Sequence, residues 1–199
     1  MNPEDIGKAY NQITHLWERD EFNRNNGVTQ HEQAIAFVKN RGAALDVGYG
    51  CTGRFIDLLL SEGFKPEGVD ISKGMITLSQ KRHSELKFHH KNICEWDVPQ
   101  KYDFITAWDS IWHIPLDQQE KVLTKLISSL NTGGVLIFSC GGTDNQGDHK
   151  DDFMGPEVYY SSLGINGFLN LFISLGCICR HLEYDQYPEL HTYFIVQKP

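Results

Sequence analysis

The sequence predicts an α/β fold in which helices cover both faces of a mostly parallel sheet. Apolar runs typical of strands alternate with amphipathic stretches typical of helices along the 199 residues, and such alternation is typical of parallel sheets. One strand runs directly into a glycine-rich turn at 45–53. The last two strand-like runs are joined by residues 185–191, a connection too short for a parallel crossover, so we expect the chain to close with an antiparallel hairpin.

Each element is predicted from its local pattern. Asp117 with Glu120 three positions later forms a capping box, which predicts a helix from that point to the Asn131–Gly134 turn. Ser72 is suited to cap a helix that extends to about residue 84. Periodicity predicts further helices at 52–63 and 163–175, and strands at 43–47, 65–71, 86–92, 102–108, 135–140, 177–184 and 192–197.

The length fits one domain with an ordinary core. We expect residues 1–40 to form a helical cover and 41–140 to form the cofactor-binding core. The 141–162 stretch, long for a compact domain, is expected to be a substrate loop, and 163–199 to hold a helix and the final hairpin. The expectation is therefore a single domain, 1–199.

The amino-acid composition limits the kinds of partner that the protein is expected to bind. The formal net charge is −8, and no cluster of Lys and Arg is visible, which argues against a nucleic-acid partner. No apolar run approaches the roughly 20 residues that span a bilayer, and the first 30 residues are polar, so we expect a cytoplasmic protein with no membrane partner. A small molecule is the expected partner, and the sequence leaves the oligomeric state open.

The cysteines and histidines do not predict a metal site. The five cysteines form no CxxC pair, so reduced thiols are expected. His89, His90 and Cys94 are metal-ligand types, but adjacent side chains on a strand point to opposite faces and no fourth ligand is evident. We therefore expect no bound metal.

The turn LDVGYGCTG at 45–53 predicts a nucleotide-type ligand site. Gly48, Gly50 and Gly53 allow a tight strand-to-helix turn and a close approach of ligand to backbone. The helix that follows directs its amide hydrogens and positive dipole end to the same space. Glycine turns of this kind also occur for purely architectural reasons.

Polar residues follow the next strands along the chain. In parallel sheets the carboxyl ends of the strands meet at one edge, so these residues should converge there. Asp70 is suited to accept hydrogen bonds from a ribose diol, Ile71 offers an apolar face for a base, and Asn92 has an amide for pairing with a ring. Helix capping by Asp70 and loop formation by Asn92 are the structural alternatives. Asn92 is followed by Ile93, and the next strand ends at Trp108-Asp109.

The carboxylate of Asp46 decides which nucleotide fits. It lies two residues before the first glycine, where the pyrophosphate of a dinucleotide would meet a like charge in a partly dry cleft. A cationic group would be attracted instead. S-adenosylmethionine carries an ammonium and a sulfonium, so the turn favours this cofactor over NAD.

Together these segments resemble the class I S-adenosylmethionine-dependent methyltransferases of the small-molecule type. The resemblance covers about 40–199 and depends on LDVGYGCTGRF, GVDIS, YDFITAWDSIWHIP, LNTGGVLIF and the terminal hairpin. It implies a Rossmann-like three-layer sandwich with a seven-stranded sheet and a reversed last strand, and S-adenosylhomocysteine as product. It also implies that Asp46 and the glycines lie near the methionine part, Asp70 at the ribose, and Ile71 and Ile93 against adenine. The family's usual loop is G-x-G-x-G, and Cys51-Thr52 adds one residue here.

The segment 109–115 should border the site of methyl transfer. His113 is the candidate general base, with packing at the sheet edge as its alternative role. The N-terminal aromatics Tyr10 and Trp17 are expected to cover the cleft, although aromatic stripes are often ordinary packing. Further acceptor contacts are expected from Trp112, Tyr159 and Tyr160.

Three functions remain open from the sequence. The first is an S-adenosylmethionine-dependent methyltransferase that places a small acceptor in line with the sulfonium methyl. The second is an NAD-dependent oxidoreductase, which the spacing G-x-G-x-x-G and the position of Asp70 favour and which Asp46 and the hairpin oppose. The third is a non-catalytic module that binds S-adenosylmethionine.

Overall fold

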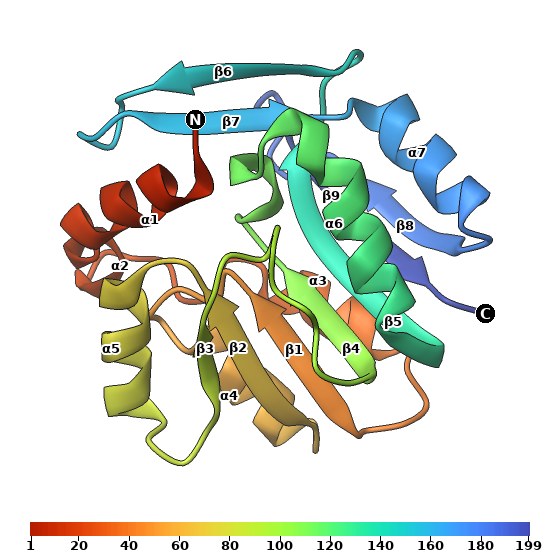
Figure 1. The fold of residues 1–199 in the computed structure, drawn as a ribbon. Helices are drawn as coiled ribbons and strands as arrows, with labels where there is room; N and C mark the ends of the chain where they lie inside the picture. Colours follow the sequence, from red (N-terminus) through yellow and green to blue (C-terminus); the bar gives the residue numbers. More distant parts are fainter.

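The computed structural model describes residues 1–199 as a three-layer α/β sandwich (Figure 1). Its seven-stranded sheet has the order β3-β2-β1-β4-β5-β9-β8. The strands are β1 (Ala43–Val47), β2 (Lys65–Asp70), β3 (Phe88–His90), β4 (Tyr102–Ala107), β5 (Leu130–Gly141), β8 (Ile178–Glu183) and β9 (His191–Gln197). The first five run parallel, and β9 pairs antiparallel with both β5 and β8. The expected sandwich and reversed last strand are thus confirmed.

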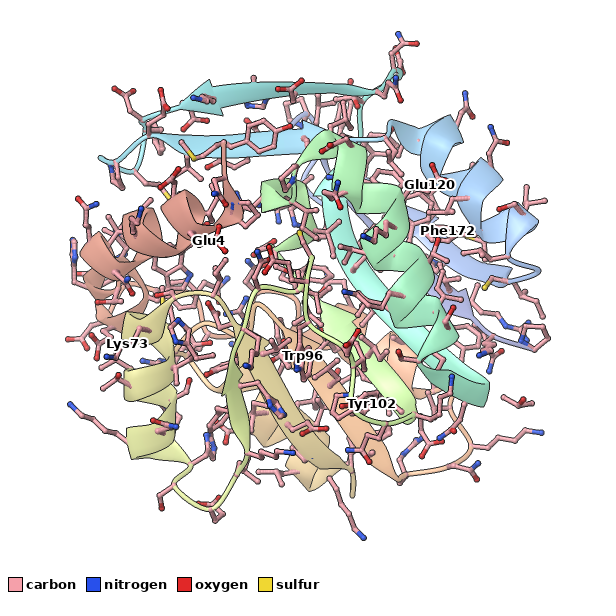
Figure 2. The ribbon with its side chains drawn as sticks, in the orientation of Figure 1. Glu4, Lys73, Trp96, Tyr102, Glu120 and Phe172 are labelled. Carbon is pink, nitrogen blue, oxygen red and sulfur yellow. The ribbon has the colours of Figure 1, made fainter.

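Helices cover both faces of the sheet. One face carries α3 (Val28–Ile35) and α4 (Arg54–Ser61), and the other carries α6 (Leu116–Ser128) and α7 (Ile165–Ser174). Strand β5 shows why both faces bind helices: Val135 and Ile137 pack in the core under α3 and α4, while Leu136 and Phe138 pack toward α6 and α7. In Figure 2, Phe172 marks α7. A strand buried on both sides reads as a continuous apolar run, which is the pattern seen in the sequence.

Two further helices border the open edge of the sheet. Helix α5 (Lys73–Arg82) flanks β2 and β3, and α1 (Pro3–Gln12) lies beside it above the strand ends (Figure 1). The short α2 (His15–Glu18) continues from α1. The N-terminal segment is therefore helical and lies over the carboxyl edge of the sheet.

Several predicted boundaries are wrong. The 141–162 segment is not an irregular loop, because β6 (Gly147–Asp151) and β7 (Val158–Ser162) pair there as a separate antiparallel sheet. The third strand is only three residues long, and β5 begins at Leu130, directly after α6.

The predicted capping box is not formed. Helix α6 begins at Leu116, after Pro115, with no side-chain cap. The backbone N–H of Leu116 instead donates to the hydroxyl of Tyr159 on β7, at 3.2 Å. A contact across the fold therefore replaces the expected local one.

Candidate active site

The carboxyl ends of the parallel strands surround one cavity of about 370 Å³. Residues from α1, α2, the β1–α4 turn, β2, and the segments after β3 and β4 line it. None of the helices combines the length and apolar composition that crossing a bilayer requires. Most of the residues predicted for the site line this cavity.

The glycine turn has the backbone that its sequence predicts. Gly48, Gly50 and Gly53 have φ values of 72°, 60° and 73°, a region that strains other residues. A Cβ on Gly48 would lie 2.4 Å from the Cβ of Ser110, whereas one on Gly50 would meet nothing within 4 Å. Gly48 is therefore required by packing, while Gly50 leaves open space at the cavity. Gly53 does not line the cavity.

The carboxylate of Asp70 binds the turn and still faces the cavity. Its Oδ2 accepts from the Gly50 amide at 3.1 Å, and its Oδ1 accepts from the Ser72 amide at 2.7 Å. Each carboxylate oxygen has a further lone pair, so a diol can still bind. Burial raises the pKa of Asp70 to about 6, against the lowering effect of these amides.

Asp46 is buried on β1, directly before the cavity-lining residues Val47 and Gly48, and does not itself line the cavity. It is 2 % exposed, and burial and the charges of Arg54 and Asp70, with no hydrogen bond, determine its protonation. Burial raises the pKa of Asp46 to about 7, and the positive charge of Arg54 opposes this shift. A buried carboxylate without a donor is costly, so a ligand cation nearby would relieve it.

The remaining residues predicted for the cofactor line the cavity: Ile71, Asn92, Ile93, Trp108 and Asp109. The Asn92 amide already donates to Glu4 of α1 at 3.1 Å, and Glu4 is labelled in Figure 2. The buried indole nitrogen of Trp108 has no hydrogen-bond partner. This nitrogen lies against Gly27 at the start of α3, so it is a packed group of the core and does not point into open space.

His113 is held by three hydrogen bonds. Its Nδ1 lies 2.8 Å from the carbonyl oxygen of Tyr159, which can only accept, so Nδ1 carries the proton. Nε2 must then accept from both the Tyr10 hydroxyl at 2.6 Å and the Trp112 indole at 3.0 Å. Burial lowers the pKa of His113 to about 4, and the imidazole is therefore neutral near pH 7.

Four of the five aromatic residues predicted for the acceptor line the cavity: Tyr10, Trp17, Trp112 and Tyr160. Tyr159 does not, and this prediction is corrected. Its ring packs with Ile6 and Ala9 of α1, and its hydroxyl is the group that accepts from Leu116. Neighbouring residues of a strand face opposite ways, which explains why only Tyr160 reaches the cavity.

Sequence reasoning missed a charged cluster at the same cavity. His191, on β9, lies between Asp109 (Nε2 to Oδ1, 3.1 Å) and Asp185 (Nδ1 to Oδ1, 2.5 Å). The two carboxylates raise the pKa of His191 although burial lowers it. Arg54 also lines the cavity, with Nη2 4.0 Å from Asp109 Oδ2. These pairs join residues up to 82 positions apart, so no local motif marks them.

Residues 22–164 match the family model of a methyltransferase domain. The chain belongs to this methyltransferase family. The fold and the strand-edge site agree with S-adenosylmethionine as the cofactor. An NAD-dependent oxidoreductase, the second function that the sequence left open, is not favoured. The usual dinucleotide-binding sheet has the strand order 3-2-1-4-5-6, whereas here the reversed strand β9 lies between β5 and β8.

Individual relatives agree with the family. An uncharacterized methyltransferase from Alkaliphilus oremlandii is 23% identical over 145 residues, 68% of this chain and 67% of that protein. The alignments with the first curated relatives span 48% to 67% of their lengths.

Solved structures share the fold. Magnesium protoporphyrin IX methyltransferase from Synechocystis, solved with S-adenosylmethionine bound, has a TM-score of 0.73 at 15% identity and covers 100% of this chain and 98% of that one. The Burkholderia thailandensis 1,6-didemethyltoxoflavin N1-methyltransferase has a TM-score of 0.75 at 15% identity, covering 100% and 91%. Its crystals contained the acceptor and S-adenosylhomocysteine.

Proposed function

We propose that this methyltransferase transfers a methyl group to a small molecule bound in the same cavity as the cofactor. One observation carries the proposal: a single cavity joins the ends of β1, β2 and β3 to aromatic residues of α1, α2, β7 and the segment after β4. The first half suits adenosine and the second suits an acceptor. The small-molecule acceptor of the Burkholderia relative supports this reading.

The residues proposed to bind the cofactor differ in the part of the cofactor that each would contact. Asp70 would accept from the ribose hydroxyls, while Ile71 and Ile93 would pack against adenine. Asn92 would add a polar contact with the ring through the amide hydrogen that Glu4 does not use. Asp46 would attract the ammonium group from its buried position on β1.

The rest of the turn and the β4 end would hold the methionine part. Gly48 and Gly50 would admit it, and Gly53 would keep the loop closed. Trp108 and Asp109 would face the reacting end of the cofactor. The bound cofactor supplies an electrophilic methyl group on sulfur, so the chain must mainly align the nucleophile.

For His113 we propose a part in holding the acceptor wall. Its Nε2 lone pair already accepts from Tyr10 and Trp112. Removing a substrate proton there would require one of these bonds to open, and a group whose pKa is about 4 is a weak base at neutral pH. Tyr10, Trp17, Trp112 and Tyr160 would then contact the acceptor.

Labelled methyl transfer tests the function. The purified protein is incubated with S-adenosylmethionine labelled on its methyl carbon and a small-molecule metabolite extract. We expect label in at least one small molecule and an equal amount of S-adenosylhomocysteine, with both reduced at least tenfold by Asp70→Asn. Tight binding of S-adenosylhomocysteine with no labelled product from any extract would contradict catalysis and support a binding module.

A further inference from the structure

The acceptor end of the cavity is an aromatic cage with one available carboxylate oxygen. We define the cage by the rings of Tyr10, Trp17, Trp112 and Tyr160 together with Asp109, all of which line the cavity. Tyr10 and Trp17 come from α1 and α2, Trp112 and Asp109 from the segment after β4, and Tyr160 from β7. None of these five residues is among those assigned to adenosine, although α1, which carries Tyr10, also covers Ile71.

The rings are inclined to one another rather than stacked. Tyr10 and Trp17 have centroids 5.3 Å apart and planes at 41°, and Trp112 and Tyr160 are 6.4 Å apart at 52°. His113 links the two pairs, with centroids 5.2 Å from Tyr10 and 5.0 Å from Tyr160. A cation within about 6 Å of the face of a Trp or Tyr ring is attracted by that ring, so several rings lining one cavity can act together on a compact cation.

The orientation of these rings is fixed by the fold. Tyr10 and Trp112 both donate to Nε2 of His113. The outer face of Tyr160 stacks on His149 of β6, at 5.2 Å and 13°. The hydrogen bonds occupy the polar tips of Tyr10 and Trp112, so what these two residues offer a ligand is the ring itself.

Asp109 supplies the charge. It has a φ of 53°, a strained value for a residue other than glycine, and is held by Ser139 and His191 through Oδ1. Its Oδ2 accepts no hydrogen bond, and Arg54 Nη2 lies 4.0 Å from it. His191 contacts Asp109 through Nε2 and Asp185 through Nδ1, so a proton on this imidazole is shared between two carboxylates.

Building on the proposed function, we infer that the methyl acceptor is an amine whose cationic form is recognised by the cage. Aromatic faces attract ammonium groups, and the carboxylate of Asp109 adds ionic attraction. For transfer the ammonium first gives up a proton through Asp109 Oδ2 to water. The nitrogen lone pair then forms the new N–C bond as the C–S bond breaks and its electron pair stays on sulfur.

Choline and its uncharged carbon isostere 3,3-dimethylbutan-1-ol test the cage. Each is titrated into protein saturated with S-adenosylhomocysteine, whose neutral sulfur fills the cofactor side, and tryptophan fluorescence is followed. We expect choline to bind at least tenfold more tightly than the isostere. Equal binding, or no choline binding at tens of millimolar, would overturn the inference.

Variants show whether the cage is responsible. Trp112→Leu and Asp109→Asn should each reduce the preference for choline at least threefold, with a melting transition retained as evidence of folding. Phe153→Leu is the matched control, because Phe153 is 95 % exposed and lies outside the cavity lining. A preference unchanged in both cage variants would place choline elsewhere and overturn the inference.

The two proposals fail in different ways. If S-adenosylhomocysteine does not bind, the proposed function is wrong, and the choline titration is repeated on the protein alone. If it binds and the isostere equals choline, methyl transfer stands and the amine class is wrong.

Discussion

Two buried carboxylates dominate the site at the scale of residues. Asp46 and Asp70 end neighbouring strands, and burial raises the pKa of both, to about 7 and about 6. The negative charge of Asp70 adds to the cost of ionising Asp46, yet both carboxylates occur where a cationic, hydroxyl-bearing cofactor is expected. Ligand binding can therefore offset the free-energy cost of burying these two carboxylates in the protein without cofactor.

Adenosine binding should depend on pH through Asp70. Above pH 7 this carboxylate is ionised and accepts from the ribose hydroxyls, and below about pH 6 protonation removes an acceptor. We expect the dissociation constant of adenosine, measured by calorimetry, to rise several-fold between pH 7.5 and pH 5. Asp70→Asn should bind more weakly and show little pH dependence. Adenosine lacks the ammonium group, so Asp46 contributes little; an equal pH dependence in the variant would refute the assignment.

Gly50→Ala should separate binding from folding. The added methyl meets no protein atom within 4 Å and occupies cavity space, while the φ of 60° costs about 1–2 kcal/mol. We expect a fall in Tm of several degrees and at least a tenfold loss of affinity for S-adenosylhomocysteine.

Gly63→Ala is the matched control for this substitution. Gly63 has a φ of 83° with similar open space, but it lies at the end of α4, outside the cavity lining. A similar fall in Tm with unchanged affinity is expected. If both variants bind equally well, the turn does not contact the cofactor.

At the scale of elements, α1 closes the site. Asn11 Oδ1 accepts from the Ser72 hydroxyl at 2.9 Å and from the Gly74 amide at 2.7 Å, which joins α1 to the start of α5. The close approach is visible at Gly7, where an added Cβ would lie 2.8 Å from the carbonyl oxygen of Ile71. Helix α1 thus lies directly over a residue assigned to adenine.

Asn11→Ala should loosen this cover. The loss of two hydrogen bonds costs about 1–3 kcal/mol locally, so we expect faster amide exchange over Pro3–Gln12 and several-fold weaker binding of S-adenosylhomocysteine. Gln12→Ala, which removes only an exposed bond to Lys8, is the control. Unchanged exchange across α1 in Asn11→Ala would show that the helix is held by other contacts.

Elements that are determined by their own residues were predicted well from the sequence. Elements that depend on contacts with residues far along the chain were not. The β1–α4 turn and the buried strand β5 follow from glycines and apolar runs in the sequence itself. The start of α6 depends on Tyr159, 43 residues away, and the β6–β7 pair forms beside α1 and α6. Likewise Asp70 was found from its strand, whereas His191 joins the site only because β9 returns beside β5.

At the scale of the whole molecule, the buried carboxylate of Asp46 should lower the free energy of unfolding of the protein without cofactor. Asp46 titrates at about pH 7 in the folded chain against an ordinary value of 3.8. A carboxyl group whose pKa is higher in the folded than in the unfolded state stabilises the fold. This stabilisation is complete when the pH is below the unfolded-state pKa, and it is lost as the pH rises through the folded-state pKa. The ionised form therefore weakens the fold at pH 8.

Asp46→Asn should stabilise the cofactor-free protein at pH 8. Each pKa unit corresponds to about 1.4 kcal/mol, so a gain of a few kcal/mol in the free energy of unfolding is expected from urea denaturation. The gain should shrink as pH falls from 8 toward 4. Comparing variant with parent at each pH removes the opposing contributions of buried His31 and His113. A variant less stable than the parent at pH 8 would show that Asp46 is stabilised by a partner in the folded state.

The most direct test is calorimetric titration of the methyltransferase with S-adenosylhomocysteine and with NAD, alongside Asp70→Asn. The account predicts micromolar-range binding of S-adenosylhomocysteine, at least tenfold weaker binding by the variant, and no heat with NAD. Binding of NAD without S-adenosylhomocysteine, or an affinity unaffected by the loss of the Asp70 carboxylate, would contradict it.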